Sequence, residues 1–435
     1  MRHFVAKMFL LLMMAAVAAA AETVPLSLAD AVQRALHEGS RAQLARTAAE
    51  RATIARTEAL QSLLPQADAR IIRYNQSINL ETFGFTLPGQ PPVIGPFNVS
   101  DAQIAAAMQV FNLAALRHYQ ALRAGEAASR YAVQQAENDV AAAVARLYVI
   151  AQRAASQVRS RQADIELFGR VLQTAQDEFK AGTGTRLDVA QATVQVDRAK
   201  QALLLAQNDE RNAVLALLNA IGMDEGATVE LTDPLPAAIA APPVDAALRT
   251  AQQNRPELKT MAEREKSASL ALSAARSRRL PSLGVDFLGD WSGNHATELL
   301  WTRRIAATLS MPLFHADIEA AAARARADYH DVEIQNRQLQ RDVEQDVRSS
   351  VMNLENANAR VAVATENERV AGEALSVARD RRAAGYGSPV EVDRAQDIYR
   401  QAREDLIAAQ ADAAAAQFDL EHATGEIRQR IGEQQ

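Results

Sequence analysis

A short turn broken by two glycines occurs twice in the chain, and this duplication constrains the fold more than any other feature. The copies are 179–189 (FKAGTGTRLDV) and 382–392 (RAAGYGSPVEV), about 203 residues apart. They match at both glycines, the next aliphatic residue, the acidic residue and the last valine: Gly182 with Gly385, Gly184 with Gly387, Leu187 with Val390, Asp188 with Glu391, and Val189 with Val392. Each copy lies between two long segments with helical spacing of apolar residues. We therefore expect two structural repeats.

The composition favours long helices over a thick globular core. Aromatic residues make up only 5% of the chain, whereas alanine and charged residues are abundant. Such a sequence with helical periodicity is typical of long, closely packed helices. The formal net charge of -6 provides no basic field for nucleic acid. The absence of cysteine excludes disulfides, thiolate metal sites, a cysteine nucleophile and a lipidated N-terminal cysteine.

The first 21 residues have the pattern of a secretory signal peptide. Arg2 and Lys7 precede the apolar run 8–17, and alanines 18–21 follow it. This predicts a signal peptide over 1–21 with cleavage near Ala21; the alternative is a short membrane anchor. No other apolar run approaches the ~20 residues that a transmembrane helix needs. If the mature chain enters a membrane, it is expected to do so as strands.

The first repeat is expected over 22–221. A helix that begins near Leu26 is predicted to end at Leu64, because Pro65 lacks an N–H and restricts the residue before it. A β-hairpin is predicted over about 66–111, followed by a proline-free helix of about 70 residues, a turn at 181–186 and a helix to Ile221. In the hairpin, apolar and polar residues alternate, with Ile72 and Tyr74 assigned to the apolar face and Asp101, Gln103 and Gln109 to the polar face. Strands of a membrane barrel have this pattern, and hairpins of a soluble sheet are the alternative.

The second repeat is expected over 244–424, after a linker of glycines and prolines at 222–243. It contains a helix that Pro281 ends, a β-hairpin at about 282–312 and a second long helix. A turn at 385–388 and a last helix follow, and 425–435 is predicted to be a flexible tail. The polar side of this second hairpin carries Arg304, Thr308 and Ser310.

The expected elements require association of several chains if the strands lie in lipid. Each unpaired backbone group at an open strand edge in a bilayer costs several kcal/mol, and single-chain bacterial barrels begin at about eight strands. Four strands per chain therefore have to combine between copies. Two copies give eight strands and three give twelve, and strand counting leaves both possibilities open.

The ordered set of motifs resembles the outer membrane efflux protein family, the TolC-like proteins. The resemblance covers nearly all of the mature chain. It rests on the duplicated layout, on the LPQ and LPS segments at 64–66 and 280–282, and on the repeated turn G-x5-[DE]-V. Each motif alone is weak, but their ordered duplication behind a signal peptide is specific.

The resemblance implies a mainly α fold with membrane β structure. Duplicated long antiparallel helical hairpins would form an α-helical barrel, and four strands per chain would contribute to a trimeric twelve-stranded outer membrane β-barrel. It further implies a passive exit duct of a tripartite efflux pump or a type I secretion system, in the outer membrane of a Gram-negative bacterium with its helices in the periplasm. The expected partners are two further copies, a periplasmic adaptor protein, an inner membrane transporter of the RND or ABC type, and outer membrane lipid. The alternative function is a soluble periplasmic coiled-coil scaffold or adaptor.

The resemblance also implies roles for individual residues. Pro65 and Pro281 would mark the helix-to-strand junctions. At the tip, the candidate adaptor contacts are Gly182, Leu187, Gly385 and Val390. The candidate residues of a periplasmic aperture are Asp188 and Glu391, with Asp393 as a further carboxylate and with Arg186 and Arg394 as partners for ion pairs. The chain departs from some relatives in having Arg394 where they have an acidic residue. Helix capping is the structural alternative for Asp188 and Glu391, and turn formation is the alternative for the glycines.

Other candidate sites are weaker. Trp291 and Trp301 flank the second hairpin loop, and the preference of indole for the membrane boundary predicts an interface position there. The histidines show no metal-ligand spacing, so neither a metal nor a cofactor is expected. The sequence contains no recognisable nucleophilic triad, phosphate loop or acid–base pair, and a passive duct needs none.

Overall fold

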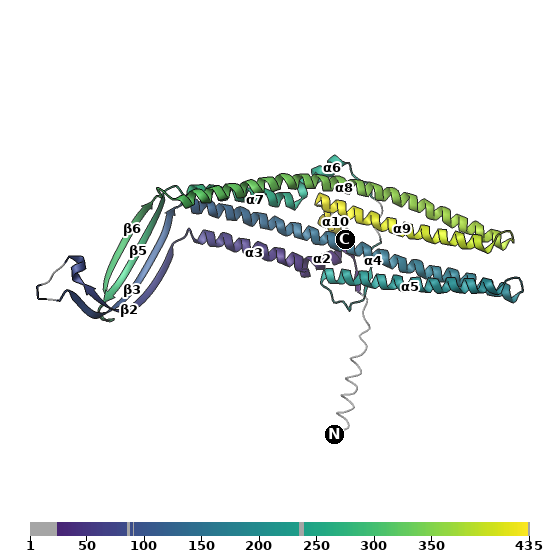
Figure 1. Cartoon of the computed structure of the whole chain (residues 1–435), viewed down its shortest axis with the longest axis horizontal. Coiled ribbons are helices and arrows are strands. Elements are labelled where there is room, and N and C mark those ends of the chain that lie inside the picture. The colour runs from purple at the N-terminus through teal and green to yellow at the C-terminus, as the bar shows by residue number, and fades with distance from the viewer. Residues whose placement is uncertain (1–23, 85–87, 90, 235–238, 434–435) are drawn as a thin grey trace, which may run out of the picture. The chain divides into compact units, whose positions relative to one another are not determined.

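The computed structural model describes residues 24–84, 88–89, 91–234 and 239–433 (Figure 1). The expected signal peptide lies outside the described residues. The chain divides into two compact units: unit 1 comprises residues 1–46, 132–258 and 339–435, and unit 2 comprises 47–131 and 259–338. Among the described residues, no helix combines the length and apolar character needed to cross a bilayer.

The prediction of long antiparallel helical hairpins is confirmed. Helices α4 (Leu113–Lys180) and α8 (Ala316–Ala383) each contain 68 residues, and both contribute to the two units. After a turn, α4 is followed by α5 (Arg186–Ile221) and α8 is followed by α9 (Pro389–Thr424), and both of these helices contain 36 residues. In Figure 1 the two hairpins lie side by side within unit 1.

The helix that opens each repeat is broken, whereas the sequence predicted one continuous helix. The first repeat contains α2 (Leu28–Glu38) and α3 (Ser40–Gln61), and a Cβ at Gly39 would lie 2.2 Å from the Ala35 carbonyl oxygen. The second contains α6 (Val244–Asn254) and α7 (Pro256–Ser277). The proline that opens α7 pushes the preceding Arg255 out of helical geometry, to φ −64° and ψ 118°.

Two short segments that the sequence assigned to a linker and a flexible tail are ordered. Strand β4 (Val229–Leu231), inside the expected linker, pairs in parallel with β1 (Val24–Leu26). The expectation of a flexible tail is wrong for 427–433, because α10 (Ile427–Glu433) packs two isoleucines into the core, Ile427 and Ile431. Their two apolar positions in a short polar stretch were too weak a signal to predict this packing.

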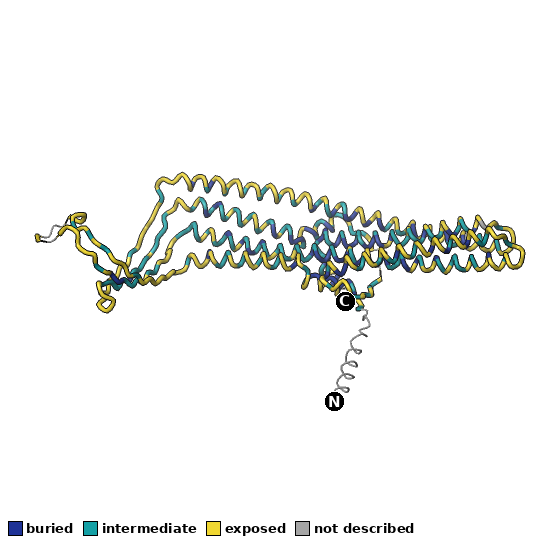
Figure 2. The backbone as a smooth tube through the Cα atoms, turned by 60° about the horizontal axis from the view of Figure 1, so that its bottom comes forward, coloured by how far each residue is buried: buried dark blue, intermediate teal, exposed yellow. Residues whose placement is uncertain are grey.

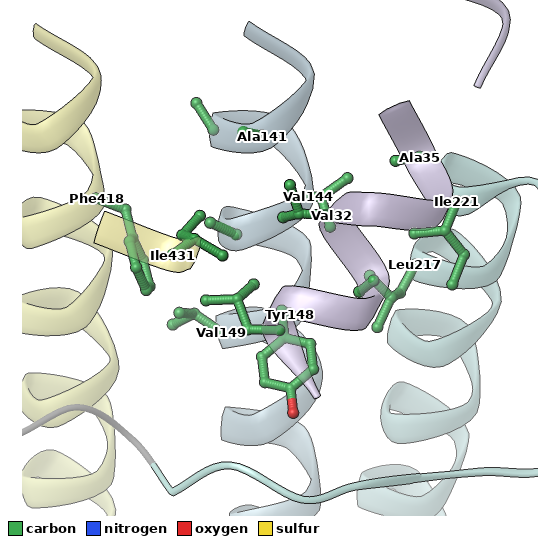
Figure 3. Close-up of a cluster of buried hydrophobic side chains, with 14 of the residues drawn as sticks. Val32, Ala35, Ala141, Val144, Tyr148, Val149, Leu217, Ile221, Phe418 and Ile431 are labelled. Carbon is green, nitrogen blue, oxygen red and sulfur yellow. The ribbon is translucent and has the colours of Figure 1, made fainter. Parts of the chain in front are cut away.

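The main core of unit 1 surrounds the middle of α4 (Figure 3). Leu217 and Ile221 of α5 pack there with Tyr148 of α4, and Figure 2 shows buried residues concentrated where these helices meet. The Tyr148 hydroxyl donates a hydrogen bond to the Leu26 carbonyl oxygen (2.9 Å) and accepts one from the Asp233 N–H (3.3 Å). Burial raises the pKa of Tyr148 to about 12, so the phenol remains neutral and joins β1 to the segment after β4.

Truncation in this core is expected to destabilise unit 1. Leu217 is fully buried, so Leu217→Ala removes three carbons and leaves a cavity, at a cost of about 2–5 kcal/mol. Thermal unfolding of the detergent-solubilised protein, followed by circular dichroism, should show a lower midpoint. Ile239→Ala at an exposed position is the matched control. An unchanged midpoint for Leu217→Ala would contradict this packing.

The strands of unit 2 form one antiparallel sheet in the order β2-β3-β5-β6 (Figure 1). They are β2 (Gln66–Asn79), β3 (Val93–Phe111), β5 (Ser282–Gly293) and β6 (Leu300–Ser310). Antiparallel register places Ile104 opposite Gly289 and Gln103 opposite Asp290, so neighbouring residues of β3 point to opposite faces. The four predicted strands are therefore present, with one apolar and one polar face.

The face assignment predicted for β2 is wrong. Ile72 pairs with Asp101 and Tyr74 pairs with Val99, which places both side chains on the polar face of the sheet. Ile71, paired with Ala102, lies on the apolar face and is 87% exposed. The consecutive isoleucines made the phase of the alternation ambiguous, and only the register with β3 resolved it.

Candidate functional site

The two glycine turns have the same backbone geometry. Gly182 (φ +77°) and Gly385 (φ +80°) adopt the left-handed conformation, which β-carbons disfavour. The Gly182 N–H donates to the Phe179 carbonyl oxygen (3.1 Å), and the Gly385 N–H donates to that of Arg382 (3.0 Å). Among the described residues, no atom lies within 4 Å of a Cβ placed at either position, so backbone conformation, not crowding, favours glycine here.

The second glycine of each turn is required by close packing. A Cβ on Gly184 would lie 3.0 Å from the Glu178 Cβ, and one on Gly387 would lie 2.9 Å from the Arg382 backbone nitrogen. Both N–H groups donate hydrogen bonds to the end of the preceding helix, that of Gly184 to Glu178 (3.0 Å) and that of Gly387 to Arg381 (3.1 Å). The repeated sequence thus encodes one turn structure twice.

The helices that follow the turns are capped differently. Thr185 and Asp188 form a capping box at α5, in which the Thr185 hydroxyl accepts from the Asp188 N–H and the carboxylate accepts from the Thr185 N–H. At α9 the Ser388 hydroxyl accepts from the Glu391 N–H (3.3 Å). Helix capping, the structural alternative for the two acidic positions, is therefore present at Asp188.

Asp188 remains ionised in this geometry. Hydrogen bonds from Thr185 and the charge of Arg382 lower the pKa of Asp188 below its usual value of 3.8. A lowered pKa means that the stabilisation from the ionised carboxylate is present above pH 3.8 and is lost only as the pH falls through the lower, folded-state value. Mild acidification is consequently not expected to release the α5 cap.

An ion pair joins the two hairpins beside the turns. Glu178, near the end of α4, accepts a charge-assisted hydrogen bond from Arg382, near the end of α8 (3.1 Å). Their side chains are 38% and 25% exposed. Sequence analysis missed this pair, because its two residues lie 204 positions apart in the chain.

The other candidate tip residues are separated into two environments. Leu187 and Val390 are 64% and 72% exposed, and Arg186 and Arg394 are also exposed. Neither of these arginines makes an ion pair with the described residues of its own chain. Asp393 instead lines a cavity of about 360 Å³ enclosed by α4, α5 and α9.

The wall of this cavity contains a buried amide without partners. Gln396 is 2% exposed, and neither its Oε1 nor its Nε2 has a hydrogen-bond partner among the described residues. Gln195, on α5, also leaves its Oε1 unpaired there. Burying an amide group without a hydrogen-bond partner destabilises the fold. The cavity is large enough to hold water molecules that could bind these amides.

Ion pairs hold α4 to α9 along unit 1. They are Arg146–Asp419 (2.6 Å), Arg153–Asp412 (3.9 Å) and Arg161–Glu404 (2.6 Å), together with Arg403–Asp164. The first three pairs are partly exposed, so each contributes modestly, whereas the Asp164 carboxylate that pairs with Arg403 is buried. They nevertheless fix α4 and α9 as the two central helices of the four.

The sheet of unit 2 carries a polar, hollowed face. Its side chains include Gln103, Gln109, Asp286, Asp290, Arg304, Thr308 and Ser310. A pocket of about 320 Å³ lies on this face near the first residues of β2 and β5. Pro65 and Pro281 are the residues immediately before these two strands.

The opposite face is apolar over most of its length. Its aliphatic and aromatic members include Ile104, Met108, Leu283, Val285, Phe287, Ile305 and Leu309. Trp291 pairs with Trp301 across β5 and β6 on this face, with ring centroids 4.2 Å apart. A sheet with one apolar and one polar face can separate lipid from water.

Comparison with protein families identifies the chain. The model of the outer membrane efflux protein family matches residues 98–223 and 247–426. The chain belongs to this family. Members of this family form trimers within tripartite pumps. The chain is an outer membrane efflux channel with a periplasmic helical extension. The family is a channel family and is not enzymatic. The alternative of a soluble periplasmic scaffold is therefore set aside.

Solved structures of outer membrane channels share the fold of this efflux channel. The Campylobacter jejuni CmeC channel is 16% identical with a TM-score of 0.80, over 93% of this chain and 88% of that one. VceC from Vibrio cholerae is also 16% identical, with a TM-score of 0.79, over 92% and 96% of the two chains. The open Neisseria gonorrhoeae MtrE channel is 19% identical with a TM-score of 0.71, over 92% and 88%. None of the curated protein sequences matches the chain.

Proposed function

We propose that three copies of this efflux channel close their sheets into one twelve-stranded barrel whose polar faces line the duct. The observation that carries this proposal is the sheet itself, which separates apolar from polar side chains and leaves β2 and β6 with one neighbour each. Such edges are costly in lipid unless another strand pairs with them. The three strand pairs within one copy are antiparallel. We therefore expect β6 of one copy to pair with β2 of the next copy in an antiparallel arrangement as well.

The apolar face is nearly as tall as the apolar band of outer membrane barrels. From Leu283 to Trp291 the strand rises about 26 Å, at about 3.3 Å per residue. A strand tilt of about 40° reduces this to about 20 Å along the membrane normal, near the ≈ 25 Å apolar band of such barrels. The Trp291–Trp301 pair would then lie at one boundary of the lipid.

The second part of the proposal is that the two turns of each copy form the periplasmic aperture. Three-fold repetition would bring Asp188 and Glu391 around one axis, where carboxylates favour cations. The Glu178–Arg382 pair supports a closed arrangement because it joins the two hairpins within each copy. Arg186 and Arg394 are exposed and remain available to neighbouring copies.

Ion selectivity tests the aperture. Combining Asp188→Asn with Glu391→Gln removes two carboxylates per copy, while Asn retains a side-chain oxygen that can accept the Thr185 N–H of the capping box. In planar bilayers the ratio of cation to anion permeability is expected to fall at least several-fold, because the fixed negative charge at the constriction is lost. Asp177→Asn, exposed on α4, is the control. An unchanged ratio in the double variant would place the selective constriction elsewhere.

We further infer that the tip binds a periplasmic adaptor, which links the duct to an inner membrane transporter of the RND or ABC type. Leu187 and Val390 expose most of their apolar side chains beside the turn glycines Gly182 and Gly385, which supports a docking role. Combining Leu187→Asp with Val390→Asp should weaken co-purification of the adaptor at least tenfold while the oligomer persists. Retained adaptor binding would remove this assignment.

A further inference from the structure

A large hollow in unit 2 lies between α3, α4 and α7, which run side by side in Figure 1. Its volume is about 750 Å³. The Thr53 hydroxyl of α3 donates a hydrogen bond to the Glu126 carboxylate of α4 (3.2 Å), and the Ser267 hydroxyl of α7 donates one to the Ala121 carbonyl oxygen of α4 (2.8 Å). These contacts hold the three walls together around a space that is wide enough for a small solute.

Positive charge predominates in the lining of this hollow. Its charged members are four cations and two carboxylates, whereas the whole chain has a formal net charge of -6. They are Arg56, Arg123, Arg130 and Lys266 against Glu126 and Glu263. The local excess of positive charge is opposite in sign to the charge of the chain, so the hollow attracts anions from solution.

The buried carboxylate of Glu126 orients two of the arginines. Glu126 is 4% exposed and pairs with both Arg130 (2.7 Å) and Arg56 (3.2 Å). Burial alone would raise the pKa of Glu126, but hydrogen bonds from Arg130 and Thr53 outweigh burial and lower this pKa below 4.5. The carboxylate is therefore ionised at neutral pH. Its single negative charge neutralises only one of the two guanidinium groups that it holds.

Arg123 supplies the second excess charge. It is exposed and makes no ion pair with the described residues, whereas Lys266 already pairs with Glu263 (3.2 Å). Arg123 and Arg130 are seven residues apart, or about two turns, so they lie on the same side of α4. Guanidinium groups present forked donors that match the oxygens of a phosphate group. The two arginines are therefore the principal candidates for binding an anion here.

The hollow lies beyond the lipid headgroups of the barrel proposed above. Arg123 and Arg130 are ten and seventeen residues after the first residue of α4, Leu113, which places them about 15 and 26 Å along the helix. The headgroup layer adds only about 5–8 Å on each side of the hydrocarbon core. A lipid phosphate therefore does not reach these arginines, whereas a dissolved anion does.

We propose that this hollow binds a dissolved phosphate monoester, with Arg123 and Arg130 as its main donors. A monoester carries a charge of about −1.5 to −2 at neutral pH, which matches the excess of positive charge in the lining. The exclusion of lipid rests on the barrel proposed above, but the binding residues all belong to one chain. A ligand held between α3 and α4 would also stabilise unit 2 by mass action.

Binding of glycerol 3-phosphate to the full-length channel in phospholipid-free detergent tests the proposal. Isothermal titration calorimetry, with the ionic strength kept constant by sodium chloride, is expected to show one saturable site per chain. Arg123→Gln should weaken the affinity at least about fivefold, because a charge-assisted contact with the phosphate is lost. Circular dichroism of this variant should be unchanged, since the natural Arg123 has no ion pair with the described residues to lose.

A variant of α7 provides the matched control. Arg264 is exposed and does not belong to the lining, so Arg264→Gln removes the same charge from unit 2 without altering the hollow. Its affinity for glycerol 3-phosphate should stay within about twofold of the natural value. Equal weakening by Arg123→Gln and Arg264→Gln would show a general charge effect and overturn the site. The absence of saturable binding to the natural channel would overturn it as well.

Nanodiscs distinguish a dissolved phosphate from a lipid phosphate. The same titration is made in nanodiscs of phosphatidylcholine and in nanodiscs that also contain phosphatidylglycerol, and saturable binding in both supports the proposal. Loss of binding only with phosphatidylglycerol would show that the lipid occupies the hollow, and it would overturn the assignment to a dissolved anion.

The native mass of the detergent sample tests the barrel separately. A trimer without saturable binding overturns the phosphate site and leaves the trimeric duct intact. A monomer that binds glycerol 3-phosphate, with the expected loss in Arg123→Gln, overturns the trimeric duct and supports the site.

Discussion

Lysine in place of Ile104 is expected to prevent assembly of the channel in the outer membrane. Ile104 lies on the apolar face of β3, opposite Ala69 and Gly289 on the two neighbouring strands. A lysine on the lipid-facing band of a barrel costs from up to about 1 kcal/mol near its boundary to about 2–4 kcal/mol at its middle, and each of three copies would bear this cost. Outer membrane fractionation and the yield of heat-labile trimer on a gel should both show a loss of at least tenfold.

The adjacent residue provides the matched control for this experiment. Gln103 points to the polar face, opposite Asp290, so Gln103→Lys introduces the same charge one residue away. If the polar face borders water, this variant should assemble normally. Normal assembly of both variants, or equal loss of both, would contradict the assignment of the two faces.

Reversal of charge at Arg382 is expected to open the periplasmic tip. Arg382→Glu replaces an attraction to Glu178 and Asp188 by repulsion, beside the turn where the two hairpins meet. An exposed ion pair of this kind contributes up to about 1 kcal/mol. Three copies acting together would shift the balance between closed and open states by about 3 kcal/mol, or roughly a hundredfold. The measurement is single-channel conductance in planar bilayers, which should rise several-fold.

The neighbouring arginine tests whether the contact matters or only the net charge. Arg381 is exposed, and Arg381→Glu changes the net charge by the same amount. We expect its conductance to match that of the natural channel. Glu178→Arg, added to Arg382→Glu, should restore the low conductance because it restores the pair in the opposite orientation. Equal conductance in all of these channels would show that this ion pair does not hold the tip.

The helical hairpins and the strand count followed from local patterns that extend over many residues. A helix of 68 residues contains so many repeats of the apolar spacing that no alternative element fits. The turns were predictable because the same left-handed backbone conformation requires a glycine in each of them, at Gly182 and at Gly385. The breaks at Gly39 and Arg255 were missed because single residues decide them within otherwise continuous patterns.

The candidate site was predicted less completely than the fold. The sequence located the turn residues because they repeat, but it placed Asp393 with Glu391, whereas the structure places it in a cavity between helices. The Glu178–Arg382 pair joins residues 204 positions apart, and charge alone does not identify partners at that separation.

The sequence by itself determined the elements of this channel, their order and their duplication, because periodicity, proline and glycine act on the neighbouring backbone. Only the tertiary structure decided which face of β2 is apolar, whether 427–433 is ordered, and which helices lie at the edges. Each of these depends on a partner distant in the chain: the register with β3, the core around Tyr148, and the α4–α9 ion pairs. Contacts of this kind are selected by three-dimensional packing and leave little trace in local sequence.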